Sequence, residues 1–281
     1  MTARSATASG KIIVSGDHAL VYGKPGIAFP AQNTITVNWK QDRKRAIEIL
    51  WPGTEPSSPW IAYMRKIIHR CDTGKSPLAG TMEVLNYLPI GKGMGSSTAL
   101  LIAMCKTLLG EDCRNEALNI EDEMNPGHSG MDFAVIWENR PIRFQKGTGA
   151  LPVEIPVDSL ANAVLIDTGK PNETTPELVA WVQSRAGDVL IVDAIETIGR
   201  CTERILAGED LQTVMRDHHR AQVALGVVPK HVQNFIAAIE RLGGSAKVIG
   251  AGARTGGGGM VLAIHEDPRR IHALVEPISH S

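Results

Sequence analysis

A cluster of glycines that joins an alternating segment to an apolar one constrains this chain more than any other feature. Residues 80–87 alternate apolar and polar side chains, which predicts a strand, and residues 97–109 carry the apolar pattern of a buried helix. Between them, residues 89–99 read Pro-Ile-Gly-Lys-Gly-Met-Gly-Ser-Ser-Thr-Ala. Glycines let backbone N–H groups converge, and the following helix directs its positive end to the same place. The turn therefore favours an anion site, and a flexible turn with a serine N-cap is the alternative.

The other residues of this turn suit a phosphate. Lys92 adds a full positive charge, and the hydroxyls of Ser96 and Ser97 are suited to phosphate oxygens or to a magnesium ion. The spacing is not that of a Walker A loop, because no Gly-Lys-Ser/Thr follows a four-residue gap. It is not a dinucleotide motif either, because a serine stands in the place of the third glycine.

A second glycine cluster, at residues 250–259, holds six glycines in ten residues between two apolar, strand-like segments. Apolar flanks are unlike those of a flexible linker and favour a loop that a substrate approaches closely. Arg254 in this loop is either a phosphate ligand or a solvated side chain.

A third cluster, at residues 127–132, follows a proline break. Ser129 and Asp132 match a capping box, which would give Asp132 a structural role at a helix start. Alternatively, Asp132 and Glu121 flank a tight turn and meet in space. One carboxylate would then hold magnesium and the other would meet a substrate hydroxyl.

Composition excludes several classes of protein. The 281 residues carry 29 basic and 30 acidic side chains and only 4% aromatics, so neither a basic face for duplex nucleic acid nor a base-stacking platform is expected. No apolar run reaches the roughly 20 residues of a membrane span, and the first ten residues lack the apolar core of a signal peptide. The cysteines have no CxxC spacing and predict reduced thiols in a cytoplasmic protein; they are Cys71, Cys105, Cys113 and Cys201.

Strands and helices interleave without strict alternation, which predicts an α+β fold in two lobes. We place the lobe boundary near Leu160, which gives domains at residues 1–160 and 161–281. The adjacent His218 and His219 are predicted to lie on a solvated helix face. Strands are expected at residues 11–16, 34–39, 46–50, 80–87, 141–144, 163–167, 247–249 and 260–264. Helices are expected at residues 61–70, 97–109, 115–123, from 130, at 177–185 and 189–207, as a pair within 211–242, and at 272–275.

Taken together, the motifs resemble those of the GHMP kinases, a superfamily of small-molecule kinases. Residues 11–28, 89–99 and 247–260 are similar to its three motifs in order, and Pro-x-Gly-x-Gly-x-Gly-Ser-Ser is the most specific of them. Within the superfamily, the opening residues 11–25 and the turn at 127–132 resemble the mevalonate kinases, as do residues 167–174 and 224–227.

This resemblance implies a two-lobed GHMP kinase fold. Its N-terminal lobe, which binds ATP and carries catalysis, would be similar to domain 2 of ribosomal protein S5, and its C-terminal lobe would be ferredoxin-like. The implied activity is ATP-dependent phosphorylation of mevalonate to 5-phosphomevalonate in isoprenoid precursor synthesis, in the cytoplasm, with ATP and Mg²⁺ as cofactors. The alternatives are a kinase of phosphomevalonate, of the 3-hydroxyl of mevalonate or of a sugar, and a non-catalytic sensor of ATP and metabolite. Neither nucleic acid nor membrane is an expected partner, and a homodimer stays open.

The resemblance also assigns residues. Asp132 would be the catalytic aspartate with Lys11 beside it, and Ser97 and Glu121 would be magnesium ligands. The substrate would contact Asp17, His18, Thr174 and Gly252. The loop around the ATP phosphates would comprise Pro89, Gly91, Lys92, Gly93, Met94, Gly95, Ser96 and Ser97.

The chain departs from the family pattern at four places. Asp17 stands where glutamate is usual, His128 replaces a proline, and Lys92 is unusual in the glycine loop. Residues 253–255 read as an insertion in the third motif. Of the implied properties, the identity of the phosphoryl acceptor depends most on these four positions.

Overall fold

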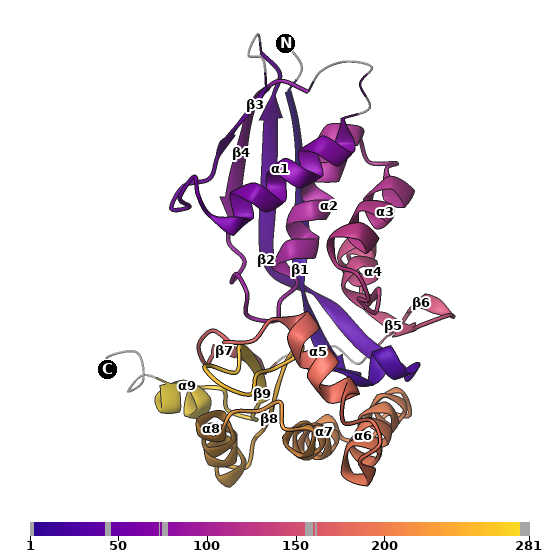
Figure 1. The fold of residues 1–281 in the computed structure, drawn as a ribbon. Coiled ribbons are helices and arrows are strands. Elements are labelled where there is room, and N and C mark those ends of the chain that lie inside the picture. The colour runs from indigo at the N-terminus through magenta and orange to yellow at the C-terminus, as the bar shows by residue number, and fades with distance from the viewer. Residues whose placement is uncertain are drawn as a thin grey trace. The chain divides into compact units, whose positions relative to one another are not determined.

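The computed structural model describes residues 3–42, 46–72, 74, 78–154, 160 and 162–275, and it confirms the α+β class (Figure 1). Contacts divide the chain into two compact units. Unit 1 comprises Met1–Lys11, Pro30–Pro89 and Gly95–Arg140, and unit 2 comprises Ile12–Phe29, Ile90–Met94 and Pro141–Ser281. The domain boundary near Leu160 stays a prediction, because residues 155–159 and 161 lie outside the described ranges.

Unit 1 contains strands whose alternating residues bury one face. Two long strands, β1 (Ala3–Ser15) and β2 (Gly26–Lys40), pair with each other and continue along the chain into unit 2. In unit 1, β2 pairs antiparallel with β4 (Gly80–Asn86), which pairs parallel with β3 (Ile47–Leu50). Ile35, Val37 and Trp39 alternate along β2 and are buried, as a half-buried strand requires.

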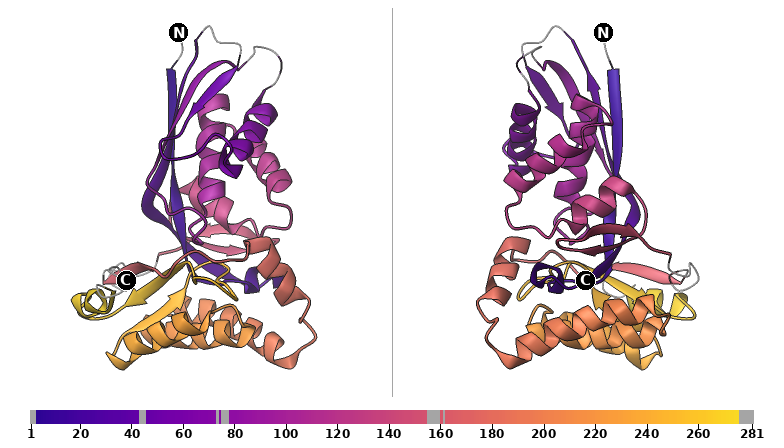
Figure 2. Two further views of the ribbon diagram at one scale, coloured as in Figure 1. Left: turned by 60° about the vertical axis from the view of Figure 1, so that its left-hand side comes forward. Right: turned by 90° about the vertical axis from the view of Figure 1, so that its right-hand side faces the viewer.

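Four helices of unit 1 lie on one side of its strands: α1 (Pro59–Cys71), α2 (Ser96–Leu109), α3 (Arg114–Met124) and α4 (Met131–Glu138) (Figure 2). Every residue of α2 from Thr98 to Cys105 is buried, so this helix is surrounded by protein and has no polar face over these turns. The glycine turn of residues 89–95 therefore leads into a helix that is fixed in the core.

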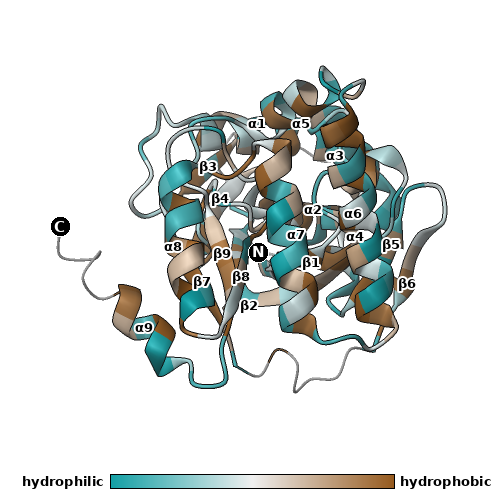
Figure 3. Cartoon of the chain, turned by 90° about the horizontal axis from the view of Figure 1, so that it is seen from below, coloured by the Kyte–Doolittle hydropathy of each residue, from teal (hydrophilic) through white to brown (hydrophobic). Residues whose placement is uncertain are grey.

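Unit 2 contains a second sheet in the order β7 (Ala163–Asp167), β9 (Met260–Ile264), β8 (Ser245–Val248), and all of its pairs are antiparallel. The helices α7 (Leu211–Leu225) and α8 (Lys230–Arg241) pack against β8, and α6 (Val189–Leu206) packs against α7. Figure 3 shows hydrophobic and hydrophilic residues on different faces of α7 and α8, as expected for helices that cover a sheet. The remaining elements of unit 2 are η1 (Ala19–Tyr22), β5 (Ile142–Gln145), β6 (Gly149–Pro152), α5 (Thr175–Gln183) and α9 (Arg269–Val275).

Three sequence predictions were wrong in detail. Strand β1 begins at Ala3, earlier than the predicted start at residue 11. The prediction missed its first residues because small Ala and Ser side chains alternate there with weak contrast in hydropathy. The short η1 and β6 were not predicted at all. His218 and His219 are buried, at 1% and 7% exposure, so they do not lie on a solvated face. Over the described ranges, no helix is both long enough and apolar enough to cross a membrane.

Candidate active site

The predicted catalytic pair is in contact within unit 1. Lys11 on β1 is 3% exposed, and its Nζ lies 3.1 Å from Oδ1 of Asp132. Gly95 makes room for this lysine, because a Cβ at Gly95 would lie 3.0 Å from Lys11 Cγ. The geometry thus places one buried ammonium against one half-exposed carboxylate, directly beside the start of α2.

Asp132 is the second residue of α4, and its side chain does not cap that helix. The N-cap is Gly130, which has no side-chain capping bond, and Ser129 Oγ accepts from the Met131 N–H at 3.3 Å. The capping box that would have given Asp132 a purely structural role is therefore not formed. The positive end of α4 adds to the attraction that Lys11 exerts on this carboxylate.

Glu121 on α3 is a buried carboxylate with one unsatisfied oxygen. Its Oε1 accepts from Thr98 Oγ1 at 2.7 Å, whereas Oε2 has no partner among the described residues, and the residue is 2% exposed. Burial raises the pKa of Glu121, whereas Thr98, His128 and Asn125 lower it. The charge of Asp132 is the smallest influence and raises it. A cation bound at Oε2 would supply the missing partner of this buried carboxylate oxygen, so the residues present fit a metal ion.

Helix α2 begins without a side-chain cap. Its N-cap is Gly95, with φ of 72°, so the serine N-cap offered as the alternative is not formed. Ser96 is buried and Ser97 is half-buried, and the Ser97 carbonyl accepts from Tyr63 Oη at 3.4 Å. Backbone N–H groups in the first turn of a helix have no intrahelical partner, so this end of α2 suits an anion.

The part of the glycine loop in unit 2 packs against the second glycine cluster. A Cβ at Gly93 would lie 2.6 Å from the Ile249 carbonyl oxygen, and a Cβ at Gly259 would lie 2.9 Å from the Lys92 carbonyl oxygen. Both positions therefore require glycine for a close approach of two backbones. Lys92 forms an ion pair with Asp167, so its charge is shared with a protein carboxylate.

The two predicted substrate residues at the end of β1 are held by the same cluster. His18 Nε2 lies 2.8 Å from the Ala251 carbonyl oxygen, and Nδ1 is buried without a partner among the described residues. Asp17 Oδ1 accepts from the Gly250 N–H at 2.8 Å, and Oδ2 lies 2.5 Å from Lys247 Nζ. Both oxygens of Asp17 thus have protein partners, and its contact with a substrate stays a prediction.

Lys247 and His218 were not identified from the sequence. Lys247 lies on β8 with 0% exposure and also donates to the Ile13 carbonyl oxygen at 3.0 Å. His218 Nε2 lies 3.5 Å from Asp17 Oδ2, and burial lowers the pKa of His218 well below its usual value. A lysine in the middle of an apolar strand was the available signal, because a buried charge needs a partner.

The other two predicted substrate residues have clear structural roles. Thr174 is the N-cap of α5 and forms a capping box with Glu177. Gly252 has φ of 73°, and a Cβ there would lie 2.2 Å from the Val227 carbonyl oxygen. Their contacts with a substrate stay predictions.

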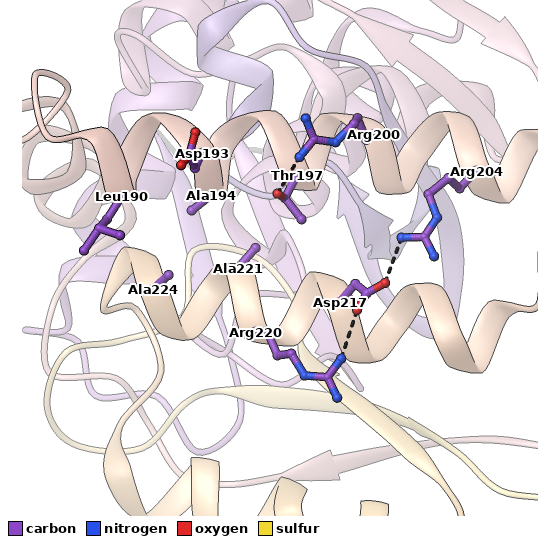
Figure 4. Close-up of a pocket in the computed structure, with 10 residues that line it drawn as sticks. All are labelled: Leu190, Asp193, Ala194, Thr197, Arg200, Arg204, Asp217, Arg220, Ala221 and Ala224. Carbon is purple, nitrogen blue, oxygen red and sulfur yellow. Dashed lines mark hydrogen bonds and ion pairs between the residues drawn. The ribbon is translucent and has the colours of Figure 1, made fainter.

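Neither a preformed metal cluster nor the cavity between α6 and α7 marks the site. Over the described residues, no group of three or more His, Cys, Asp or Glu side chains could hold a metal ion. A cavity of about 420 Å³ between α6 and α7 contains none of the predicted site residues (Figure 4). It is lined by Leu190, Asp193, Ala194, Thr197, Arg200, Arg204, Asp217, Arg220, Ala221 and Ala224.

Comparison with known proteins gives relatives along the whole chain. A mevalonate kinase of Thermococcus gammatolerans is 28% identical over 92% of this chain and 88% of its own length. A mevalonate kinase of Archaeoglobus fulgidus is 26% identical over 97% of this chain and 96% of its own length. No family model matches the chain.

Solved structures share the fold. The mevalonate kinase of Methanococcus jannaschii has a TM-score of 0.81 at 18% identity and covers 100% of this chain and 96% of its own. A phosphomevalonate kinase of Streptococcus pneumoniae has a TM-score of 0.75 at 14% identity and covers 98% of this chain and 95% of its own. The fold is that of solved GHMP kinases, and the chain is similar to mevalonate kinases of that superfamily along nearly its whole length. Within it, both sequence relatives are mevalonate kinases, and this is the branch that the chain resembles.

Proposed function

We propose that this chain is a cytoplasmic mevalonate kinase that transfers the γ-phosphoryl group of ATP to the 5-hydroxyl of mevalonate. The observation that carries the proposal is the contact between Lys11 Nζ and Asp132 Oδ1 beside the glycine-led start of α2. The full-length relationship to mevalonate kinases supports mevalonate as the acceptor. A sensor is disfavoured, because binding alone needs neither a paired proton acceptor nor an unsatisfied buried carboxylate.

Phosphoryl transfer depends mainly on positioning and on neutralising charge. In our proposal, a carboxylate oxygen of Asp132 accepts the proton of the acceptor hydroxyl as that oxygen attacks phosphorus. Lys11 holds the carboxylate in place and offsets negative charge on the transferring group. The first turn of α2 binds phosphate oxygens, because its N–H groups and the helix dipole attract anions.

Magnesium, when bound, would neutralise phosphate charge during transfer. Glu121 and Ser97 are the residues that we propose hold it, and the unpaired Glu121 Oε2 is the observation that supports this. Two protein ligands are enough for Mg²⁺, which keeps waters and phosphate oxygens in its shell.

Phosphomevalonate is the second candidate acceptor, since a phosphomevalonate kinase shares the fold. Incubation with Mg-ATP and a panel of mevalonate, phosphomevalonate, galactose and homoserine, followed by phosphorus NMR, separates the candidates. We expect 5-phosphomevalonate from mevalonate. Turnover of another panel member while mevalonate stays inert would contradict the proposal.

Asp132→Asn tests the mechanism. We expect it to fold normally and to lower kcat by about 10²–10⁴-fold, the range for loss of a proton-transfer group. The matched control is Asp122→Asn, because Asp122 on α3 is exposed and pairs with His128. Near-normal turnover in Asp132→Asn would remove this aspartate from the mechanism.

A further inference from the structure

The segment Ala253, Arg254 and Thr255, which interrupts the second glycine cluster, is firmly held in unit 2. The N–H groups of Arg254 and Thr255 donate to Glu173 Oε2 at 3.1 and 3.3 Å, and Thr255 Oγ1 donates to Glu173 Oε1 at 2.8 Å. The Ala253 N–H donates to the Val227 carbonyl oxygen at 2.9 Å. These hydrogen bonds thus fix the backbone position of Arg254, independently of the contacts that its side chain makes.

The Arg254 guanidinium rests on an aromatic ring and carries an unneutralised charge. Its Cζ lies 4.5 Å from the centre of the Trp181 ring, and Cζ of Arg185 lies 4.8 Å from the same ring. Arg185 also bonds to the Leu225 carbonyl oxygen and to Asp188. The Arg254 guanidinium has no ion pair or hydrogen bond with any residue that the structure describes, so its donors are available to a ligand.

Two buried polar atoms at the two ends of η1 also lack partners among the described residues. Tyr22, Trp181 and Ala251 pack against one cluster in unit 2, which contains Ala19, the chain neighbour of His18. Among the described residues, Tyr22 Oη and His18 Nδ1 are buried without a hydrogen bond, and His18 is only 7% exposed. An unsatisfied buried polar atom is unfavourable, so a ligand that bonds to it is favoured.

The tautomer of His18 fixes what this ligand must offer. The Ala251 carbonyl can only accept, so His18 Nε2 carries the proton and Nδ1 presents a lone pair. Burial lowers the pKa of His18, which keeps this ring neutral. Nδ1 therefore needs a donor such as a hydroxyl, whereas Arg254 needs an anion. A hydroxy acid supplies both groups in one small molecule.

We propose that Arg254 determines acceptor specificity by binding the carboxylate of the hydroxy acid, while a hydroxyl of the same molecule donates to His18 Nδ1. The proposal rests on the function proposed above and adds the residue that recognises the acid. A guanidinium pairs with a carboxylate through two parallel hydrogen bonds. The Trp181 face holds that guanidinium in place before the acceptor arrives, which lowers the entropy lost on binding.

Arg254→Gln tests this with two acceptors: mevalonate, and the neutral triol in which a primary alcohol replaces the carboxylate. A hydrogen-bonded charge is worth roughly 1.5–3 kcal/mol, so we expect KM for mevalonate to rise about 10–150-fold. The kcat and the KM for ATP should change by less than about threefold, because the phosphate loop and Asp132 are untouched. The kcat/KM for the triol should equal that of the wild type, because the triol has no anion to lose.

Arg185→Gln is the matched control, since Arg185 contacts the same ring but has protein partners of its own. We expect its KM for mevalonate to stay within about threefold of the wild type. Arg254→Lys should recover part of the affinity, because it keeps the charge without the planar fork.

Four outcomes would overturn the proposal, and the first three concern mevalonate and the triol. They are an unchanged KM for mevalonate in Arg254→Gln, an equal loss with the triol, and an equal loss in Arg185→Gln. If the KM of Arg254→Gln rises for phosphomevalonate and not for mevalonate, Arg254 binds a phosphate instead. That result would also overturn the proposal. Failure of the proposed function is distinguishable from these results, because the wild type itself would then not phosphorylate mevalonate.

Discussion

Lys247 Nζ lies 2.5 Å from Asp17 Oδ2, and neither side chain is exposed to solvent. This pair joins the end of β1 to β8, and Asp17 also binds the Gly250 N–H. The next residue, His18, has φ of 59° and ψ of −40°, a conformation that non-glycine residues rarely adopt. The buried pair therefore supports a strained residue whose ring is a candidate substrate contact.

Removing Lys247 should destabilise the protein strongly. In Lys247→Met, the Asp17 carboxylate stays buried without its cation. We expect the free energy of unfolding, measured in urea, to fall by about 3–5 kcal/mol. The double variant with Asp17→Asn should recover part of this loss, because it removes the unpaired charge. Lys230→Met, at an exposed position of α8, is the control. A single variant within about 1 kcal/mol of the wild type would show that the pair contributes little.

Glu121→Gln should separate activity from stability. We expect it to need more Mg²⁺ for half-maximal activity, because an anionic ligand is lost. In magnesium-free buffer at neutral pH, its stability should match or exceed that of the wild type, because burial raises the pKa of Glu121 and so disfavours its charge. Glu123→Gln, two residues along α3 and half-exposed, should change neither property. An unchanged magnesium dependence in Glu121→Gln would remove Glu121 from the metal site.

The buried His219 predicts a loss of stability in mild acid. Burial lowers the pKa of His219 from 6.5 to about 4. Between these values the unfolded chain binds more protons than the folded one, so stability falls as the pH falls. From pH 7 to pH 5 this residue alone should account for a loss of about 2 kcal/mol.

His219→Gln tests that contribution through thermal unfolding at both pH values. The variant should lose less stability on acidification than the wild type, whereas His69→Gln, at an exposed position of α1, should behave as the wild type does. Equal acid sensitivity in all three proteins would contradict the prediction.

A pair of glycine variants separates backbone strain from steric overlap. Gly252 and Gly127 both have positive φ, of 73° and 81°, but only Gly252 faces a close backbone atom, the Val227 carbonyl oxygen. Gly127→Ala should cost about 1–2 kcal/mol, from the left-handed conformation alone. Gly252→Ala should cost about 1–3 kcal/mol more, because a Cβ overlaps that oxygen. Urea unfolding of both variants checks the difference, and equal losses would place the cost in strain alone.

The local elements were largely predictable from the sequence, because periodicity and turn residues act over short distances. The helices at α2 and α6 and the strands at β4, β7 and β9 lie where the pattern of apolar residues predicts them. The contact between Lys11 and Asp132 could be anticipated only through resemblance to a family. Their separation of 121 positions leaves no local signal of the pairing.

The partners of buried polar residues were not predictable. His218 and His219 lie in a helix near Arg220, which suggested a solvated face. Packing of α7 against β8 buries both histidines. This packing is a long-range contact, so the local sequence carries no signal of it. Asp17 was assigned to substrate by its position in a motif, whereas its partners come from the opposite end of the sequence.

The packing of the two glycine clusters also bears on flexibility. Chains rich in glycine usually have the most conformational freedom, and ordering them on binding is costly. Here the Met260 N–H donates to the Lys92 carbonyl oxygen at 3.1 Å, and the Gly259 N–H donates to that of Gly169 at 2.9 Å. The backbone of the loop at Ile90–Met94 is therefore held at Lys92 by a main-chain hydrogen bond from β9. An anion that binds it loses little of its affinity to the ordering of the backbone.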